Sequence, residues 1–223
     1  MEHGSALFHI GSFGVTSVMV TMLGLTVLLT LICAAGTRKM QTIPPGLQNL
    51  LERGVEMLDD FLGGLLSSKL KQRFYPLLAT LFIFIMLSNY CGLLPLSGRL
   101  PGLAAPTSVL SVPAALAIIV FFTTHYAGLR AHGGGYLNHF FKPYTFLFPL
   151  LLLEEFVRPV SLSLRLYGNI FGEESVTEQL YHLAPIGVPV VMNVFSLLMG
   201  AIQAMVFVLL ACIYIEGAAG EAH

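Results

Sequence analysis

Long stretches without a charged side chain restrict this sequence to a membrane fold. Residues 15–35, 74–96, 107–129 and 190–215 contain no Asp, Glu, Lys or Arg. About 20 such residues cross the hydrocarbon core of a bilayer as a helix. Helices satisfy their own backbone hydrogen bonds, which lipid cannot do for them. We therefore expect an all-α protein that crosses the membrane several times.

Two further segments have a helical pattern but carry charge. Residues 144–182 form a long helix in which Pro149 and Pro159 can introduce kinks. Residues 47–66 place carboxylates and an arginine among leucines, which is typical of an amphipathic helix lying in the membrane interface. The expected fold is a polytopic membrane protein with about five membrane helices plus one interfacial helix. Residues 144–182 and 190–215 form its last, long hairpin.

The composition excludes several classes of protein. With 56% hydrophobic and 10% charged residues, the chain is not a soluble protein. Its net charge of −1 gives no indication about nucleic acid, and because no basic patch is present we expect no nucleic-acid partner. Its three cysteines lie in apolar runs without CxxC spacing, which argues against disulfides and zinc. No cleavable signal pattern precedes the first apolar stretch.

Lysine and arginine accumulate on one side of the membrane if five spans alternate and residues 47–66 do not cross. Only Arg99 then lies in a short loop on the other side. Because basic loops stay in the cytoplasm, the N-terminus is expected outside and the C-terminus in the cytoplasm. The basic residues on the cytoplasmic side are Arg38, Lys39, Lys69, Lys71, Arg73, Arg130 and Lys142.

A polar stripe interrupts the long helix and centres on Arg165. An arginine at the middle of a membrane helix costs roughly 2.5–3.5 kcal/mol. Polar neighbours on both sides argue against a snorkelling role for Arg165, whereas Arg158 fits snorkelling and function equally well. Glu173 lies at the edge of the stripe, and Glu174 points to the opposite side. At 100° per residue, the side chains within about 40° of Arg165 are Glu154, Arg158, Ser161, Asn169 and Gly172.

The last apolar stretch has uncharged polar and small residues along one helix face. Ser196, Gly200 and Gln203 share one helix face, with Asn193 near it. Small residues permit close helix packing, and a glutamine can bond across to a neighbouring helix. Packing alone explains this line as well as a function does. Its place across the hairpin from Arg165 favours the functional interpretation.

Motifs of soluble catalysis are absent from the sequence. It has no GxxxxGK(S/T) phosphate loop, no HExxH and no GxSxG. The acidic pairs at 154–155 and 173–174 lack the Glu-x-x-His of di-metal sites. We therefore expect no cofactor, no metal and no enzymatic activity of the chain on its own.

Residues 158–169, RPVSLSLRLYGN, resemble the signature of subunit a of F-type ATP synthases. That family's pattern reads Arg/Lys-Pro-x-Ser-Leu-x-x-Arg-Leu-x-x-Asn. Residues 88–95, SNYCGLLP, are similar to the family's asparagine-bearing helix end, and residues 202–204, IQA, match its glutamine helix. The resemblance covers about residues 74–216 and is closest to a bacterial subunit.

The resemblance implies a proton-translocating stator subunit whose last hairpin faces a rotating c ring. It implies two half-channels separated by an essential arginine, Arg165. By the same resemblance, Asn169, Glu173 and Gln203 flank the arginine in the ion path, and Asn89 joins the outer half-channel. Glu154 resembles the chloroplast and cyanobacterial variant of the path.

The chain also departs from the family pattern. Leu151 stands where many members have a carboxylate, and Ser196 stands in the ion path where some have a histidine or an acid. The family's usual Asp-x-Asn before the third span is here Val109-x-Ser111. These changes affect the outer half-channel rather than Arg165.

The implied partners are the c ring, the b-subunit stalk, the rest of the ATP synthase, membrane lipid and the transported H⁺ or Na⁺. The implied location is the bacterial inner membrane. Residues 1–223 then form a single membrane domain, with residues 1–73 holding the first span and interfacial helix and residues 74–223 the ion-channel helices.

Two other functions fit parts of the sequence. A stand-alone proton channel or secondary transporter shares the buried charges, but such transporters show inverted repeats, and none is visible here. An intramembrane enzyme using the acidic pair at 154–155 or His125 lacks a nucleophile. Co-purification with a ring of small two-helix subunits distinguishes the ATP synthase subunit from both of these alternatives.

Overall fold

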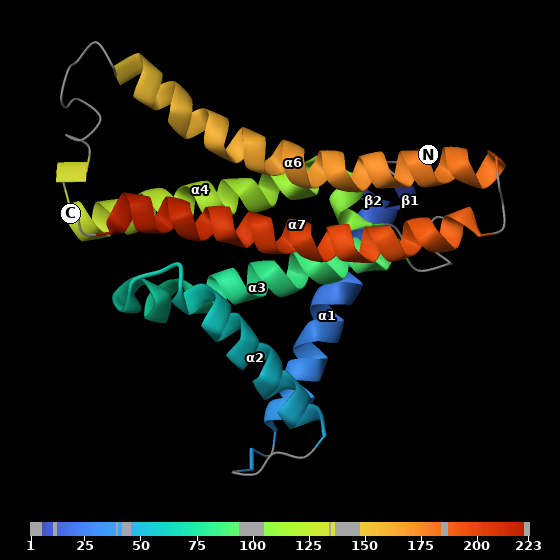
Figure 1. Ribbon diagram of the computed structural model, residues 1–223, viewed down its shortest axis with the longest axis horizontal. Coiled ribbons are helices and arrows are strands. Elements are labelled where there is room, and N and C mark those ends of the chain that lie inside the picture. The colour runs from blue at the N-terminus through green and yellow to red at the C-terminus, as the bar shows by residue number, and fades with distance from the viewer. Residues whose placement is uncertain are drawn as a thin grey trace.

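The chain folds into long helices with one small β-hairpin (Figure 1). The computed structural model describes residues 6–10, 13–38, 40–41, 46–93, 105–133, 135–136, 148–183 and 187–220. In chain order the elements are β1 (Ala6–Ile10), β2 (Phe13–Thr16), α1 (Ser17–Thr37), α2 (Leu47–Gly63), α3 (Ser68–Gly92), the 3-10 turn η1 (Pro106–Ser108), α4 (Ser111–His132), α6 (Phe148–Leu183) and α7 (Val188–Ala219).

Within the described ranges, four helices are long and apolar enough to cross a membrane. These are α1, α3, α4 and the part of α7 from Val190 to Ala219. The 36 residues of α6 extend over roughly 54 Å, which also suffices to cross, although charged side chains lower its hydropathy. The prediction of an all-α, multi-pass membrane fold is confirmed.

The packed body consists of α3, α4, α6 and α7. Figure 1 shows α6 and α7 side by side and antiparallel, with α3 along the other flank of α7. Fully buried side chains fill the interior, among them Leu78 and Ile85 of α3 and Phe207 and Val208 of α7. The predicted terminal hairpin is therefore present, and it lies within the helix layer.

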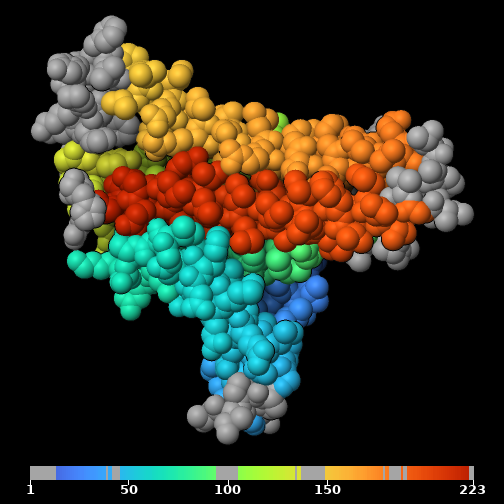
Figure 2. Space-filling model, in the orientation of Figure 1, coloured from blue at the N-terminus to red at the C-terminus, as the bar shows by residue number. Residues whose placement is uncertain are grey.

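The α1 and α2 helices project from this body as a V (Figures 1 and 2). The predicted amphipathic helix is present as α2. Lys71 Nζ of α3 pairs with Asp59 Oδ2 of α2 at 2.8 Å, and the Tyr75 hydroxyl donates to the Val55 carbonyl, also at 2.8 Å. These contacts attach the C-terminal half of α2 to α3.

The β-hairpin was not predicted. The first span was expected to begin at residue 15, but Val15 and Thr16 belong to β2. The β1 and β2 strands pair antiparallel, with Ile10 opposite Phe13. The Thr16 hydroxyl then accepts a hydrogen bond from the Met19 N–H at 3.4 Å and caps α1. β-branched residues favour a strand, and a threonine favours the cap position, which explains the boundary.

Other predicted boundaries differ by a few residues. The third span begins at Ser111 rather than at residue 107, because residues 106–108 form the η1 turn. The predicted ends at residues 96 and 144 lie outside the described residues. Pro159 lies within α6, and Figure 1 shows the N-terminal third of this helix inclined to the remainder. A proline removes one helical hydrogen bond and accounts for such a bend.

Candidate functional site

Arg165 lies near the middle of α6 with its side chain exposed. None of the hydrogen bonds or ion pairs in the described part of the chain includes it. Its neighbour Leu164 is 51% exposed, and the space around Gly168 is open. Arg165 therefore places a permanent positive charge on an exposed and mostly apolar helix face.

The remainder of the predicted stripe is divided between this face and the interior. Ser161 is exposed like Arg165, whereas Asn169, Gly172 and Glu173 are half-buried. The stripe thus turns inward along the C-terminal half of α6. The exposed part and the inward part lie on one continuous helix.

A first polar cluster lies between α6 and α7. The Glu173 carboxyl lies next to the side chains of Asn169 and Ser196. Ser196 is buried. Glu173 Oε1 and Asn169 Nδ2 are buried without a hydrogen-bond partner among the described residues. Buried polar atoms of this kind usually bind ordered water, because leaving them unpaired costs about 1–3 kcal/mol. The cluster is suited to a hydrated path.

A second polar group lies between α3 and α7. Asn89 Nδ2 donates to the Gly200 carbonyl at 3.1 Å, and Asn89 Oδ1 accepts from the Thr107 hydroxyl at 2.9 Å. Gln203, one turn beyond Gly200, is buried, and no described residue bonds its Nε2. The predicted polar line on α7 therefore faces the interior of the body.

Sequence reasoning missed Glu174. Its angular position around the helix lies opposite the Arg165 stripe, so Glu174 was left out of the predicted ion path. In the structure, a Cβ placed on Gly92 lies 3.7 Å from Glu174 Oε1, so the carboxyl reaches the end of α3.

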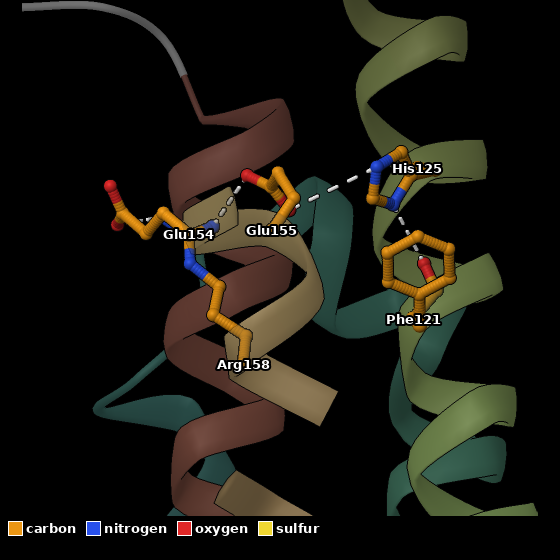
Figure 3. A network of polar contacts seen from close by, with 5 residues as sticks. All are labelled: Phe121, His125, Glu154, Glu155 and Arg158. Atoms are coloured by element: carbon orange, nitrogen blue, oxygen red, sulfur yellow. Dashed lines mark hydrogen bonds and ion pairs between the residues drawn. The ribbon is translucent and has the colours of Figure 1, made fainter. Parts of the chain in front are cut away.

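A third polar cluster joins α4 to the N-terminal part of α6 (Figure 3). Arg158 binds both acidic neighbours: Nη2 donates to Glu154 Oε1 at 2.7 Å and Nη1 to Glu155 Oε1 at 2.9 Å. The Arg158 guanidinium also lies 5.4 Å from the Tyr214 ring centroid. These contacts pair the Arg158 guanidinium within the protein, and they leave both roles predicted for Arg158, snorkelling and function, untested.

His125 completes the third cluster. Its Nε2 lies 3.9 Å from Glu155 Oε2, across the boundary between α4 and α6. The predicted Glu154 is the outer member of the acidic pair, with 57% of its side chain exposed, whereas Glu155 is 15% exposed. Neither His125 nor Glu155 was predicted for the site. Arg165 belongs to none of the three clusters.

Comparison with known proteins gives a consistent result along nearly the whole chain. The family model of the ATP synthase A chain matches residues 17–216. ATP synthase subunit a of Trichlorobacter lovleyi is 41% identical over 221 residues, which cover 97% of this chain and 93% of that protein. The subunit of Moorella thermoacetica is 43% identical over 213 residues, covering 94% and 93%. That of Geobacter sulfurreducens is 39% identical over 219 residues, covering 96% and 92%.

Proposed function

Because this chain belongs to the ATP synthase A chain family, we propose that it offers a c ring two half-channels separated by Arg165. Membership makes the chain a multi-pass membrane subunit that works with the rest of the ATP synthase complex. The subunit is not catalytic on its own. The half-channels, the role of Arg165 and the contact with the ring are the proposed part.

The observation that carries the proposal is the exposed Arg165 guanidinium on the apolar outer face of α6, which no described residue pairs with. An arginine remains protonated and cannot hand on a proton, so it blocks direct leakage between two half-channels. It also lowers the pKa of an approaching rotor carboxylate. At about 4 Å and an effective dielectric near 20, the attraction is roughly 4 kcal/mol, enough for a transient encounter.

The two polar clusters beside the C-terminal half of α6 are assigned to the outer half-channel. Its residues are Asn89, Asn169, Glu173, Ser196 and Gln203. Buried polar atoms of Asn169, Glu173 and Gln203 that no described residue bonds support this assignment, since they suit bound water. Glu154, on the other side of Arg165, is assigned to the inner half-channel.

We place the N-terminus outside and the C-terminus in the cytoplasm of a bacterial inner membrane. The start of α3, the end of α4 and the end of α7 gather at one end of the body (Figure 1). Lys69, Lys71, Arg73 and Arg130 belong to that end, which supports a cytoplasmic position. The single membrane domain of residues 1–223 then meets the c ring through α6 and the b-subunit stalk elsewhere. The carried ion is H⁺, or Na⁺ if the ring selects it.

Substitution of Arg165 tests the proposal. Arg165→Ala is expected to abolish ATP-driven proton uptake into inside-out vesicles, because the barrier and the counter-charge disappear together. ATP hydrolysis by the detached catalytic head is expected to persist. Arg165→Lys is expected to fail as well, since a lysine can lose its proton.

Arg130→Gln is the matched control, because Arg130 is an exposed arginine at the end of α4. It is expected to pump normally. Coupled pumping at the unsubstituted rate in Arg165→Ala contradicts the proposed function.

A further inference from the structure

His125 of α4 and Glu155 of α6 face each other across the boundary between the two helices. Their side chains are 25% and 15% exposed, and 3.9 Å separates Nε2 from Oε2 (Figure 3). This separation is too long for a direct hydrogen bond but closes with a shift of about 1 Å. Imidazole is the side chain that changes charge most readily between about pH 5 and 8. The geometry of the pair is therefore suited to proton exchange.

The helix backbone fixes which imidazole nitrogen faces Glu155. Nδ1 lies 2.9 Å from the carbonyl oxygen of Phe121, one turn earlier on α4. A carbonyl only accepts, so Nδ1 carries the hydrogen and donates it. In the neutral ring the lone pair is then on Nε2, which points to the Glu155 carboxyl. The Phe121 ring also contacts the imidazole, with centroids 4.2 Å apart and ring planes inclined at 42°.

The cluster has a net negative charge that one added proton neutralises. Arg158 supplies one positive charge to the two carboxylates of Glu154 and Glu155, so one negative charge is uncompensated. Protonation of His125 balances it. Among the described residues, the other titratable side chains beside the cluster are those of two tyrosines. Tyr136 lies edge-on to the imidazole, and burial, then the charge of Glu155, raises the pKa of its phenol, so it stays neutral. Tyr214 lies beneath Arg158.

A cavity of about 10 Å³ adjoins the pair, enough space for about one water molecule. His125, Glu155, Arg158, Tyr214 and Thr124 contribute to its wall. The Thr124 hydroxyl is buried, and no described residue bonds it. A water molecule in this cavity has a hydroxyl, a carboxylate and an imidazole within reach as partners.

We propose that the His125–Glu155 pair is a proton relay of the inner half-channel, which deepens the proposed function and rests on it. The Glu155 carboxylate takes a proton from the rotor carboxyl of the proposed ring, whose O–H bond breaks, and the new O–H bond of Glu155 breaks in turn as the Nε2 lone pair of His125 takes the proton. Nε2 then releases the proton to water, and the reverse order operates when ATP drives pumping. Arg158 positions the Glu155 carboxylate and takes no proton itself. His125 is the residue that exchanges protons with solvent.

Two substitutions of His125 test the relay. His125→Gln retains a polar side chain but has no titratable group, and ATP-driven proton uptake is expected to fall about tenfold or more. The pH dependence of uptake between about pH 5 and 8 is expected to flatten. His125→Ala leaves space beside the cavity, and imidazole added to the buffer is expected to restore uptake. His132→Gln is the matched control: His132 is exposed on the same helix, two turns later, and uptake is expected to stay unchanged.

The outcomes separate a relay from a structural role. Uptake in His125→Gln at the unsubstituted rate and with the same pH profile overturns the relay. Slow uptake in His125→Ala that imidazole does not restore, in complexes that retain their c ring, also overturns it and assigns His125 to packing. Both results leave the proposed function intact, provided that Arg165→Ala is inactive. Normal pumping in Arg165→Ala removes the proposed function instead.

Discussion

Asn89 joins three parts of the chain through one amide. Its two hydrogen bonds reach α7 at Gly200 and the η1 turn at Thr107, and its side chain is 4% exposed. Such an amide is satisfied only while α3, η1 and α7 keep their relative positions. Substitution of Asn89 is therefore expected to affect the packing of the subunit as well as the proposed ion transport.

Asn89→Leu is expected to destabilise the subunit by about 1–3 kcal/mol, because the buried Thr107 hydroxyl loses its acceptor. Thermal unfolding of the detergent-solubilised subunit measures the effect. Asn193→Leu is the matched control, since Asn193 is exposed on α7. Equal melting temperatures for the two variants contradict a stabilising role for Asn89.

Single residues differ in how far the sequence identifies them. Arg165 could be singled out as a candidate because a charge near the centre of a membrane helix is costly. The pairing of His125 with Glu155 could not, because it depends on how α4 and α6 are rotated against each other. Glu174 was missed for the same reason. The angular positions of residues around one helix do not show which neighbouring helix lies on each side.

At the scale of elements, α3 and α7 approach closely at Gly200. A Cβ at this position lies 3.2 Å from Asn89 Cβ, tighter than ordinary contact. The absence of a side chain there lets Asn89 reach the α7 backbone. The small residues predicted to permit close packing on α7 therefore have an identified neighbour.

Gly200→Val is expected to force α3 and α7 apart and to cost about 1–3 kcal/mol, the usual penalty for overpacking. The fraction of subunit that remains folded after heating in detergent measures it. Gly24→Val is the control, because nothing lies within 4 Å of a Cβ at Gly24 on α1. A Gly200 variant as heat-resistant as the Gly24 variant contradicts the close contact.

The existence of the membrane helices could be predicted because their lengths follow from bilayer thickness and from uncharged runs. The residues at which they begin and end were predicted less accurately. Hydropathy registers neither the pairing of β1 with β2 nor the cap at Thr16 that begins α1. Pro159 was correctly expected to allow a kink, and the helix continues through it.

At the scale of the whole molecule, orientation in the membrane is the open prediction. In a variant lacking Cys33, Cys91 and Cys212, single cysteines at Gly64→Cys and Ala131→Cys are expected to react from the cytoplasm. Both sites are exposed and lie at the basic end of the body. An impermeant maleimide should label inside-out vesicles and spare right-side-out ones. Labelling of the two sites from opposite sides contradicts the topology.

The end of α7 is fastened to the start of α3, because the Ser67 N–H donates to Glu216 Oε2 at 2.9 Å. Under the proposed function, a rotor that moves past α6 would pull this helix sideways, and α6 packs against α7. The Ser67–Glu216 bond connects α7 to α3, and the Lys71–Asp59 pair connects α3 to α2. On that proposal, these two contacts distribute a lateral load over α7, α3 and α2.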